Sequence, residues 1–216
     1  MEIEGCENPP HCRTNNGLIS YVKTHEISKN IIKAMQKVNR CDFIPKQMTQ
    51  SRKHAYYDTP LSIGYNVTIS QPSLVAKMLD YLQIESINNI LELGTGSGYN
   101  AAIISELIPY GKLTTVERIP SLGRHAKTIL KNRKNIEVII GDAMTIKYKH
   151  PFDRIIITAE FLSEDDVNDM IDNLAASYSI CIYPYKNILW RVIKCNDNII
   201  DKSKLLGVRF VPVLHN

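Results

Sequence analysis

The chain has 216 residues, which is enough for one well-buried core and short for two full domains. Its composition, 44% hydrophobic and 22% charged, is ordinary for a globular protein, and no apolar run approaches the ~20 residues of a membrane span. The net charge is only +4 and the Lys and Arg residues are scattered, without the dense cluster and interleaved aromatics of a nucleic-acid surface. We therefore expect neither a nucleic-acid nor a membrane partner.

Residues 1–16 are polar, contain Pro9 and Pro10, and are predicted to form a flexible tail. Cys6, His11 and Cys12 together suggest a metal clip, but no second Cys or His pair follows at zinc spacing, so we expect no metal. The five cysteines are odd in number and lack the spacing of a disulfide framework, which favours a reducing compartment. The first residues carry no basic start or apolar signal core, so the predicted location is cytoplasmic.

The next part, residues 27–84, is expected to be an N-terminal helical and active-site loop region. Apolar residues recur at helical spacing over 27–38, and a second helix is predicted over 71–84, with Pro72 in its first turn and Ser70 near its N-cap. The segment between them, about 46–70, has no strong period. A connection of that length is usually a functional loop.

From residue 88 the pattern alternates between strand and helix. Strands are predicted at 89–93, 112–117, 136–142 and 152–159, and helices at 99–108, 121–132 and 163–174. This alternation predicts an α/β fold, Rossmann-like and doubly wound around a mostly parallel sheet. Segments 178–185, 188–195 and 207–214 have no crossover helices between them, so they are expected to be antiparallel C-terminal strands. We interpret 88–216 as the cofactor-binding α/β core of a single domain spanning 1–216.

The stretch LELGTGSGYN, residues 91–100, leads a strand through three glycines into a helix. Glycines allow close backbone approach, and a helix N-terminus offers free N–H groups to a ligand. The dinucleotide fingerprint needs Gly or Ala where Tyr99 stands, and a pyrophosphate would be repelled by Glu92. A cationic ligand suits Glu92 better. S-adenosylmethionine, which carries a sulfonium and an amino group and no phosphate, is such a ligand.

Acidic residues also follow the next two predicted strands. Glu117, roughly 20 residues beyond the glycines, suits the ribose hydroxyls, and Asp142 suits the adenine amino group. The alternative is a turn that only packs helix on strand, with acids at strand ends. The expected cofactor contacts in this part of the chain are Glu92, Gly94, Thr95, Gly96, Ser97, Glu117, Arg118, Asp142 and Ala143.

Upstream, AYYDTPLSIGYNVTISQPSLVAKML (residues 55–79) contains Asp-x-Pro, Ile-Gly and Thr-Ile-Ser-x-Pro in order, and VERI, GDA, PFDRIIITA and VRFVP follow the glycine turn. In these motifs the sequence resembles the protein-L-isoaspartate O-methyltransferase family of class I methyltransferases, from about Ile27 to Leu214. The resemblance implies methyl transfer from S-adenosyl-L-methionine to the α-carboxylate of L-isoaspartyl residues in damaged proteins or peptides, which initiates repair through a succinimide. We expect a monomer.

The resemblance also assigns roles upstream of the glycines. Ser70 matches the family's active-site serine. Without the resemblance, its place before Pro72 would favour a role as a helix N-cap. Val67, Thr68 and Ile69 are expected to line the cofactor through backbone contacts. Asp58 either holds the loop by local hydrogen bonds or begins a turn before Pro60.

The sequence departs from the family pattern at Ala143 and within 158–186. Ala143 replaces the last residue of Gly-Asp-Gly, Glu160 and Phe161 stand where small residues are usual, and Pro184-Tyr185-Lys186 replaces Pro-Val-Gly. These changes leave two alternatives open. One is the same fold retargeted to another carboxylate or peptide, and the other is a cofactor-binding module without turnover.

Overall fold

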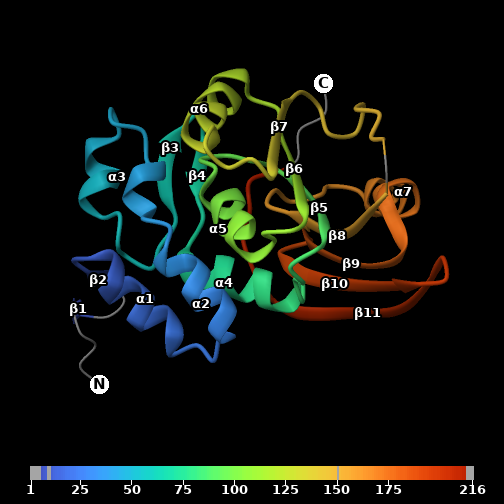
Figure 1. Ribbon diagram of the computed structural model, residues 1–216, viewed down its shortest axis with the longest axis horizontal. Coiled ribbons are helices and arrows are strands. Elements are labelled where there is room, and N and C mark those ends of the chain that lie inside the picture. Colours follow the sequence, from blue (N-terminus) through green and yellow to red (C-terminus); the bar gives the residue numbers. More distant parts are fainter. Residues whose placement is uncertain (1–5, 9–10, 150, 213–216) are drawn as a thin grey trace.

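The protein, described from a computed structural model, is ordered around a seven-stranded sheet (Figure 1). The structure describes residues 6–8, 11–149 and 151–212. The strand order is β11-β10-β9-β8-β5-β6-β7. The parallel part comprises β5 (Asn89–Leu93), β6 (Lys112–Glu117), β7 (Ile136–Ile140), β8 (Phe152–Ile157) and the start of β9 (Ala175–Tyr185). This confirms the predicted doubly wound α/β fold.

The C-terminal strands form an antiparallel meander at one edge of the sheet. β9 pairs with β10 (Ile188–Cys195), and β10 pairs with β11 (Asn198–Gly207). Each pair is joined by two residues with positive φ, Lys186–Asn187 and Asn196–Asp197, as tight hairpins require. The antiparallel arrangement is confirmed, but the strand predicted over 207–214 is wrong. The short turn after β10 makes the last strand begin nine residues earlier, at Asn198, and 208–211 run on without strand structure.

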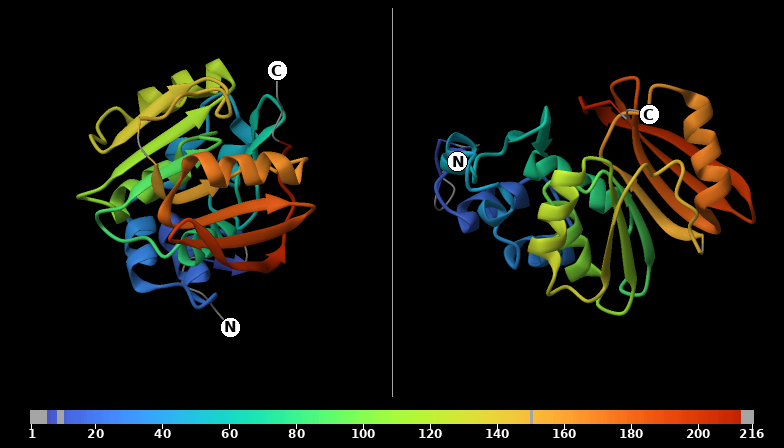
Figure 2. Two further views of the ribbon diagram at one scale, coloured as in Figure 1. Left: turned by 90° about the vertical axis from the view of Figure 1, so that its right-hand side faces the viewer. Right: turned by 90° about the horizontal axis from the view of Figure 1, so that it is seen from above.

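Helices cover both faces of the sheet (Figure 2). Ile90 and Ile156 pack in a core with α1 (Asn15–Lys23), α2 (Lys29–Gln36), α4 (Pro72–Tyr81), α5 (Tyr99–Leu107) and α6 (Pro120–Leu130). Leu91 and Ile155, one residue away in the same strands, face a second core with α7 (Glu164–Leu174). Alternate strand residues therefore serve opposite faces. This arrangement leaves the strand ends free for a site.

The N-terminal region is more structured than its sequence predicted. β1 (Cys6–Asn8) and β2 (His11–Cys12) pair antiparallel, with Cys6 opposite Cys12. Cys12 is disulfide-bonded, which the cysteine spacing did not predict, and it is therefore not free to serve in a metal clip. Helix α1 was not predicted; Thr14 caps it by accepting a hydrogen bond from Gly17 N at 3.1 Å.

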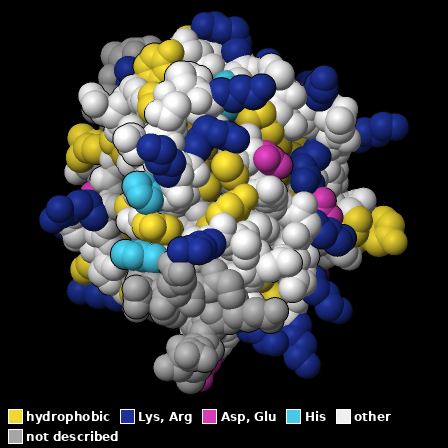
Figure 3. Space-filling view, turned by 90° about the vertical axis from the view of Figure 1, so that its left-hand side faces the viewer, with side chains coloured by type: hydrophobic (Ala, Val, Ile, Leu, Met, Phe, Trp, Pro, Cys, Tyr) yellow, Lys and Arg dark blue, Asp and Glu magenta, His cyan; other side chains and the backbone are white. Residues whose placement is uncertain are grey.

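The segment before α4 folds into short elements. These are η1 (Arg40–Phe43), α3 (Thr49–Lys53) and the hairpin of β3 (Leu61–Gly64) and β4 (Val67–Ile69). The face around them carries many dispersed Lys and Arg side chains (Figure 3). Between residues 11 and 84 the chain has ten Lys or Arg and four Asp or Glu, so its positive charge is concentrated in this part of the sequence. Across the described ranges, the helices are all too short or too polar to cross a membrane.

Candidate active site

A cavity of about 1270 Å³ opens at the carboxyl ends of β5, β6, β7 and β8. In doubly wound sheets this edge is where ligands bind, beside the point at which the strand order reverses. One wall comes from the β3–β4 hairpin and the start of α4, and another from the C-terminal residues 206–212. The predicted site residues that line it are Val67, Thr68, Ile69, Ser70, Gly94, Thr95, Gly96, Ser97, Glu117, Arg118, Asp142 and Ala143. Sequence positions up to 76 residues apart thus meet in one space.

The glycine turn is held from the neighbouring strand. Gly94 has a φ of +98°, and a Cβ there would collide with Thr158 Oγ1. The Thr158 hydroxyl donates to Leu93 O (3.1 Å) and Gly94 O (2.6 Å), closing the turn over the end of β8. Thr158 also lines the cavity but was not predicted as a site residue. Its position directly after a predicted strand, at the same sheet edge as Glu117, was the available signal.

Glu117 stands at the end of β6 and is 6% exposed. Its Oε2 accepts from Gly96 N at 2.7 Å, and its Oε1 accepts from Ile119 N at 2.8 Å. The carboxylate therefore fixes the glycine turn from the side. Because a carboxylate offers about four acceptor positions, it keeps capacity for hydroxyl donors from a ligand.

Glu92 is placed differently from the sequence expectation, because it does not line the cavity. It is fully buried, and its oxygens accept from Asn100 Nδ2 (2.7 Å) and Thr115 Oγ1 (2.5 Å). Burial raises the pKa of Glu92 to about 7, against the hydrogen bonds from Thr115 and Asn100, which lower it. Asn100, whose amide donates to Glu92, does line the cavity, so Glu92 stands behind a lining residue. Thr115 in turn contacts Thr95 Oγ1 at 2.6 Å.

The end of β7 supplies the third acidic side chain. Asp142 Oδ1 accepts from Met144 N at 3.0 Å, and Gly141 N donates to Glu117 O at 3.0 Å, so the second and third strand ends are linked. Ala143 is held from behind by Tyr148, whose hydroxyl donates to Ala143 O at 3.0 Å. Burial, and then the charge of Asp142, raise the pKa of Tyr148 above its usual value, so this donor stays protonated.

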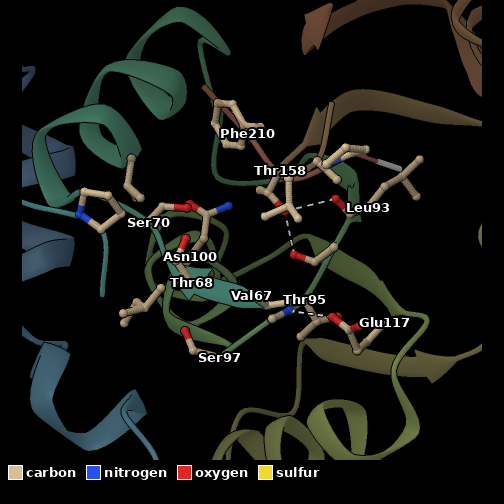
Figure 4. Close-up of a pocket in the computed structure, with 18 of the residues that line it drawn as sticks. Val67, Thr68, Ser70, Leu93, Thr95, Ser97, Asn100, Glu117, Thr158 and Phe210 are labelled. Atoms are coloured by element: carbon tan, nitrogen blue, oxygen red, sulfur yellow. Dashed lines mark hydrogen bonds between the residues drawn. The ribbon is translucent and has the colours of Figure 1, made fainter. Parts of the chain in front are cut away.

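The structure separates the two interpretations of Ser70. Helix α4 has Gln71 at its N-cap with no side-chain cap bond, so Ser70 does not cap it. Asp58 supplies that function from the preceding loop: its Oδ1 accepts from Ser73 N (2.7 Å), and its Oδ2 accepts from Ser73 Oγ (2.6 Å). Asp58 therefore holds the loop to the helix. In Figure 4 Ser70 lies beside Asn100, across the cavity from Glu117.

The segments that depart from the family pattern contact one another. Glu160 N donates to Val211 O (2.8 Å), and Glu160 Oε1 accepts from Asn187 N (2.5 Å). Phe161 is buried, and its N–H donates to Pro184 O at 3.2 Å. The substituted residues therefore join the end of β8, the β9–β10 turn and the C-terminal segment into one wall.

The family model for protein-L-isoaspartate(D-aspartate) O-methyltransferase matches residues 13–216. The chain belongs to this family. A protein-L-isoaspartate O-methyltransferase of Fervidobacterium nodosum is 37% identical over 206 residues, which cover 91% of this chain and 99% of that protein. One from Methanococcus maripaludis is 38% identical over 193 residues, covering 86% of this chain and 88% of that protein.

Solved structures confirm the fold. A Plasmodium falciparum structure described as a putative family member in complex with S-adenosyl-L-homocysteine has a TM-score of 0.78 at 23% identity, covering 94% of this chain and 99% of that one. A second protein-L-isoaspartate O-methyltransferase has a TM-score of 0.81 at 23% identity, covering 94% of this chain and 67% of that one.

Within the described residues, no group of three or more His, Cys, Asp or Glu side chains could hold a metal ion.

Proposed function

We propose that this protein transfers a methyl group from S-adenosyl-L-methionine to the α-carboxylate of L-isoaspartyl residues in damaged proteins or peptides. The observation that carries the proposal is that the Val67–Ser70 segment, from the most specific part of the sequence, lines one cavity together with the acidic strand ends Glu117 and Asp142. The family match over residues 13–216 and the relatives at 37% and 38% identity support the same reaction.

The residues present fit S-adenosyl-L-methionine. Glu117 and Asp142 would accept hydrogen bonds from the ribose hydroxyls and the adenine amino group, and Ala143 would offer its backbone N–H. Gly94, Thr95, Gly96 and Ser97 let the backbone approach closely at the start of α5, and Val67, Thr68, Ile69 and Arg118 complete the wall. When bound, the cofactor supplies an electrophilic methyl group on a sulfonium that loses its charge on transfer.

The protein's own task is positioning. A substrate carboxylate is ionised at neutral pH and needs no general base. Ser70 has a hydroxyl released from helix capping, on the side of the cavity away from Glu117. We infer that it donates a hydrogen bond that orients the substrate carboxylate toward the methyl group. Orientation of this kind is a large part of the rate enhancement available to such a reaction.

The substrate class is tested with a matched peptide pair. We expect methylation of an isoaspartyl peptide and none of its aspartyl twin. Methylation of neither peptide, together with tight cofactor binding, would favour a binding module, and equal methylation of both would favour a retargeted enzyme. The altered wall built by Glu160 and Phe161 makes this comparison necessary.

The monomeric state, the cytoplasmic location and the absence of nucleic-acid partners remain predictions.

Ser70→Ala tests the proposed orienting role. We expect kcat to fall by the equivalent of about 1.5–3 kcal/mol, the value of a hydrogen bond to a charged group, with the melting temperature unchanged. Ser51→Ala is the matched control, since Ser51 Oγ donates to Ser62 O at 2.7 Å outside the cavity. It should lower the melting temperature and leave kcat intact. Wild-type kcat in Ser70→Ala would remove Ser70 from the reaction.

A further inference from the structure

Arg40 is a completely buried arginine that does not line the cavity. It begins η1, the element that follows α2, and its exposed fraction is 0%. Burial lowers its pKa to about 10, which still leaves the guanidinium charged at neutral pH, and the charge of Asp58 acts in the opposite direction. A buried charge is costly unless its donors are satisfied. The contacts of Arg40 therefore indicate what the residue is for.

The guanidinium binds backbone carbonyls from two separate segments. Nη1 donates to Ala55 O (2.8 Å) and Tyr57 O (3.0 Å). Nη2 donates to Thr59 O (2.8 Å), to Ser70 O (3.0 Å) and, more weakly, to Ile69 O (3.4 Å). These carbonyls lie in irregular backbone or at a strand end, and buried carbonyls without a partner are destabilising. The planar guanidinium of Arg40 thus gives these carbonyls the hydrogen bonds that a longer sheet would have supplied.

One segment lines the side of the cavity proposed for the methyl acceptor, and the other supports it: Ile69 and Ser70 line the cavity, whereas the loop 55–59 lies behind them. The loop 55–59 carries Asp58, which holds the start of α4, and Ile69–Ser70 is the end of β4 with the proposed orienting serine. Arg40 Nη2 contacts both the loop, at Thr59, and Ser70 itself. A lysine could not do this, because its ammonium lacks the fixed fork of the guanidinium.

We propose that Arg40 is a positioning residue that sets the location of Ser70 for methyl transfer by joining the loop 55–59 to the end of β4. This inference rests on the proposed function, because it assigns Ser70 to the substrate carboxylate. Among the proposed cofactor contacts Arg40 reaches only Ile69 O, at 3.4 Å, and the strand ends that carry Glu117 and Asp142 are outside its contacts. Removing the fork should therefore damage the acceptor side of the site more than the cofactor side.

Arg154 provides a matched control. It is also buried, at 3% exposed, and binds backbone carbonyls, with Nε donating to Gln83 O (3.2 Å) and Nη1 to Asp153 O (2.8 Å). It lies on β8 and, like Arg40, does not line the cavity. Replacing either arginine by lysine removes a buried fork, but only Arg40→Lys releases the segments around Ser70.

The experiment compares kcat on the isoaspartyl peptide, affinity for S-adenosylhomocysteine and melting temperature in Arg40→Lys, Arg154→Lys and wild type. We expect both variants to melt earlier, and only Arg40→Lys to lose kcat, by roughly 100-fold, with its S-adenosylhomocysteine affinity close to the wild-type value. Wild-type kcat in Arg40→Lys, or equal losses in both variants, would overturn the proposal.

Amide hydrogen exchange on the wild-type protein keeps the proposal testable if Arg40→Lys does not fold. We expect the loop 55–59 and residues 69–70 to open as one unit, since the same side chain holds both. Independent opening of the two segments would contradict the assignment. This measurement needs no substrate, so its result does not depend on the proposed function. If the wild-type protein failed to methylate the isoaspartyl peptide, the proposed function would be removed. Joint opening of the two segments would still test whether Arg40 holds them together.

Discussion

The Glu117 carboxylate has two roles, and a single substitution tests both. Its carboxylate fixes Gly96 N and Ile119 N, and it faces the space proposed for the ribose. Glu117→Ala should weaken S-adenosylhomocysteine binding by about 1–3 kcal/mol, because a charged acceptor and the turn it organises are lost together. Calorimetry measures this directly. Unchanged affinity would remove Glu117 from the cofactor contacts.

Glu92 makes the stability of the protein depend on pH in a way that most carboxylates do not. Its pKa rises from 4.5 to about 7 on folding because it is buried. Between these values the folded state holds a proton that the unfolded chain has released, so stability is greatest at low pH and falls as pH rises toward 7. Glu92→Gln has no such proton. Relative to wild type, its free energy of unfolding should therefore increase by up to about 3 kcal/mol as the pH rises across this window.

Urea titrations at a series of pH values measure this difference. Glu164→Gln is the control: the hydrogen bond from Lys202 lowers the pKa of Glu164, so it titrates below the window and its difference from wild type should stay level. A level difference for Glu92→Gln as well would mean that Glu92 ionises freely in the folded protein.

Arg40 and Glu92 show what sequence patterns omit at the scale of the residue. The partners of Arg40 are backbone carbonyls, which have no signature in the sequence. The acid–glycine spacing predicted that Glu92 belongs to the site, but it did not predict which side of the strand end the carboxylate faces. Motifs predicted many of the residues that line the cavity, but not Thr158 or Asn100, and they did not predict the buried groups that hold the lining in place.

At the scale of the element, the β1–β2 hairpin is anchored to the loop that carries Asp58. His11 and Tyr57 form a bridge, and their rings stack with centroids 4.3 Å apart and an interplanar angle of 9°. Cys12, on β2, is disulfide-bonded, and this bond also constrains the hairpin. The hairpin therefore belongs to the support of the active-site loop.

Cys12→Ser should reduce the free energy of unfolding by about 2 kcal/mol, a common value for a native disulfide. Thermal melting with and without reductant measures this, and reductant should have no further effect on the variant. Cys195→Ser, which replaces a free thiol on β10, should behave as wild type. A melting temperature of wild type that is insensitive to reductant would show that the hairpin does not depend on the bond.

Helices and strands with a strong hydrophobic period were predicted well. Elements whose conformation depends on contacts with other parts of the fold were not. The strands and helices from 89 to 174 follow hydrophobic periods, because each is buried on at least one face. β11 reads NIIDKSKLLG and is largely exposed at the sheet edge, so its pattern is weak. The segment GVRFVPVL has the composition of a strand, but 208–211 serve as a wall of the cavity.

At the scale of the whole molecule, the cavity couples ligand binding to stability. S-adenosylhomocysteine at about 100 times its dissociation constant should add about 2.7 kcal/mol, or roughly 5–10 °C in melting temperature. NAD at the same concentration should give no shift, since the glycine turn is closed in by acidic side chains. Thermal shift assays with both compounds test this, and stabilisation by NAD would contradict the assignment of the site.

Trp190 is the chain's single tryptophan, and it lies on β10, where its Nε1 donates to Tyr185 O at 3.2 Å and its ring is flanked by Lys202 and Lys204. Tryptophan fluorescence, excited at a wavelength where the chain's tyrosines do not absorb, therefore reports the C-terminal meander alone, because the roof built from Arg40, the loop 55–59 and Ser70 contains tyrosines but no tryptophan. A denaturation curve followed by fluorescence can look wholly native after the roof has already opened. Enzymatic activity monitored in parallel would then fail first, and the gap between the two curves would measure how independently the two halves of the molecule melt.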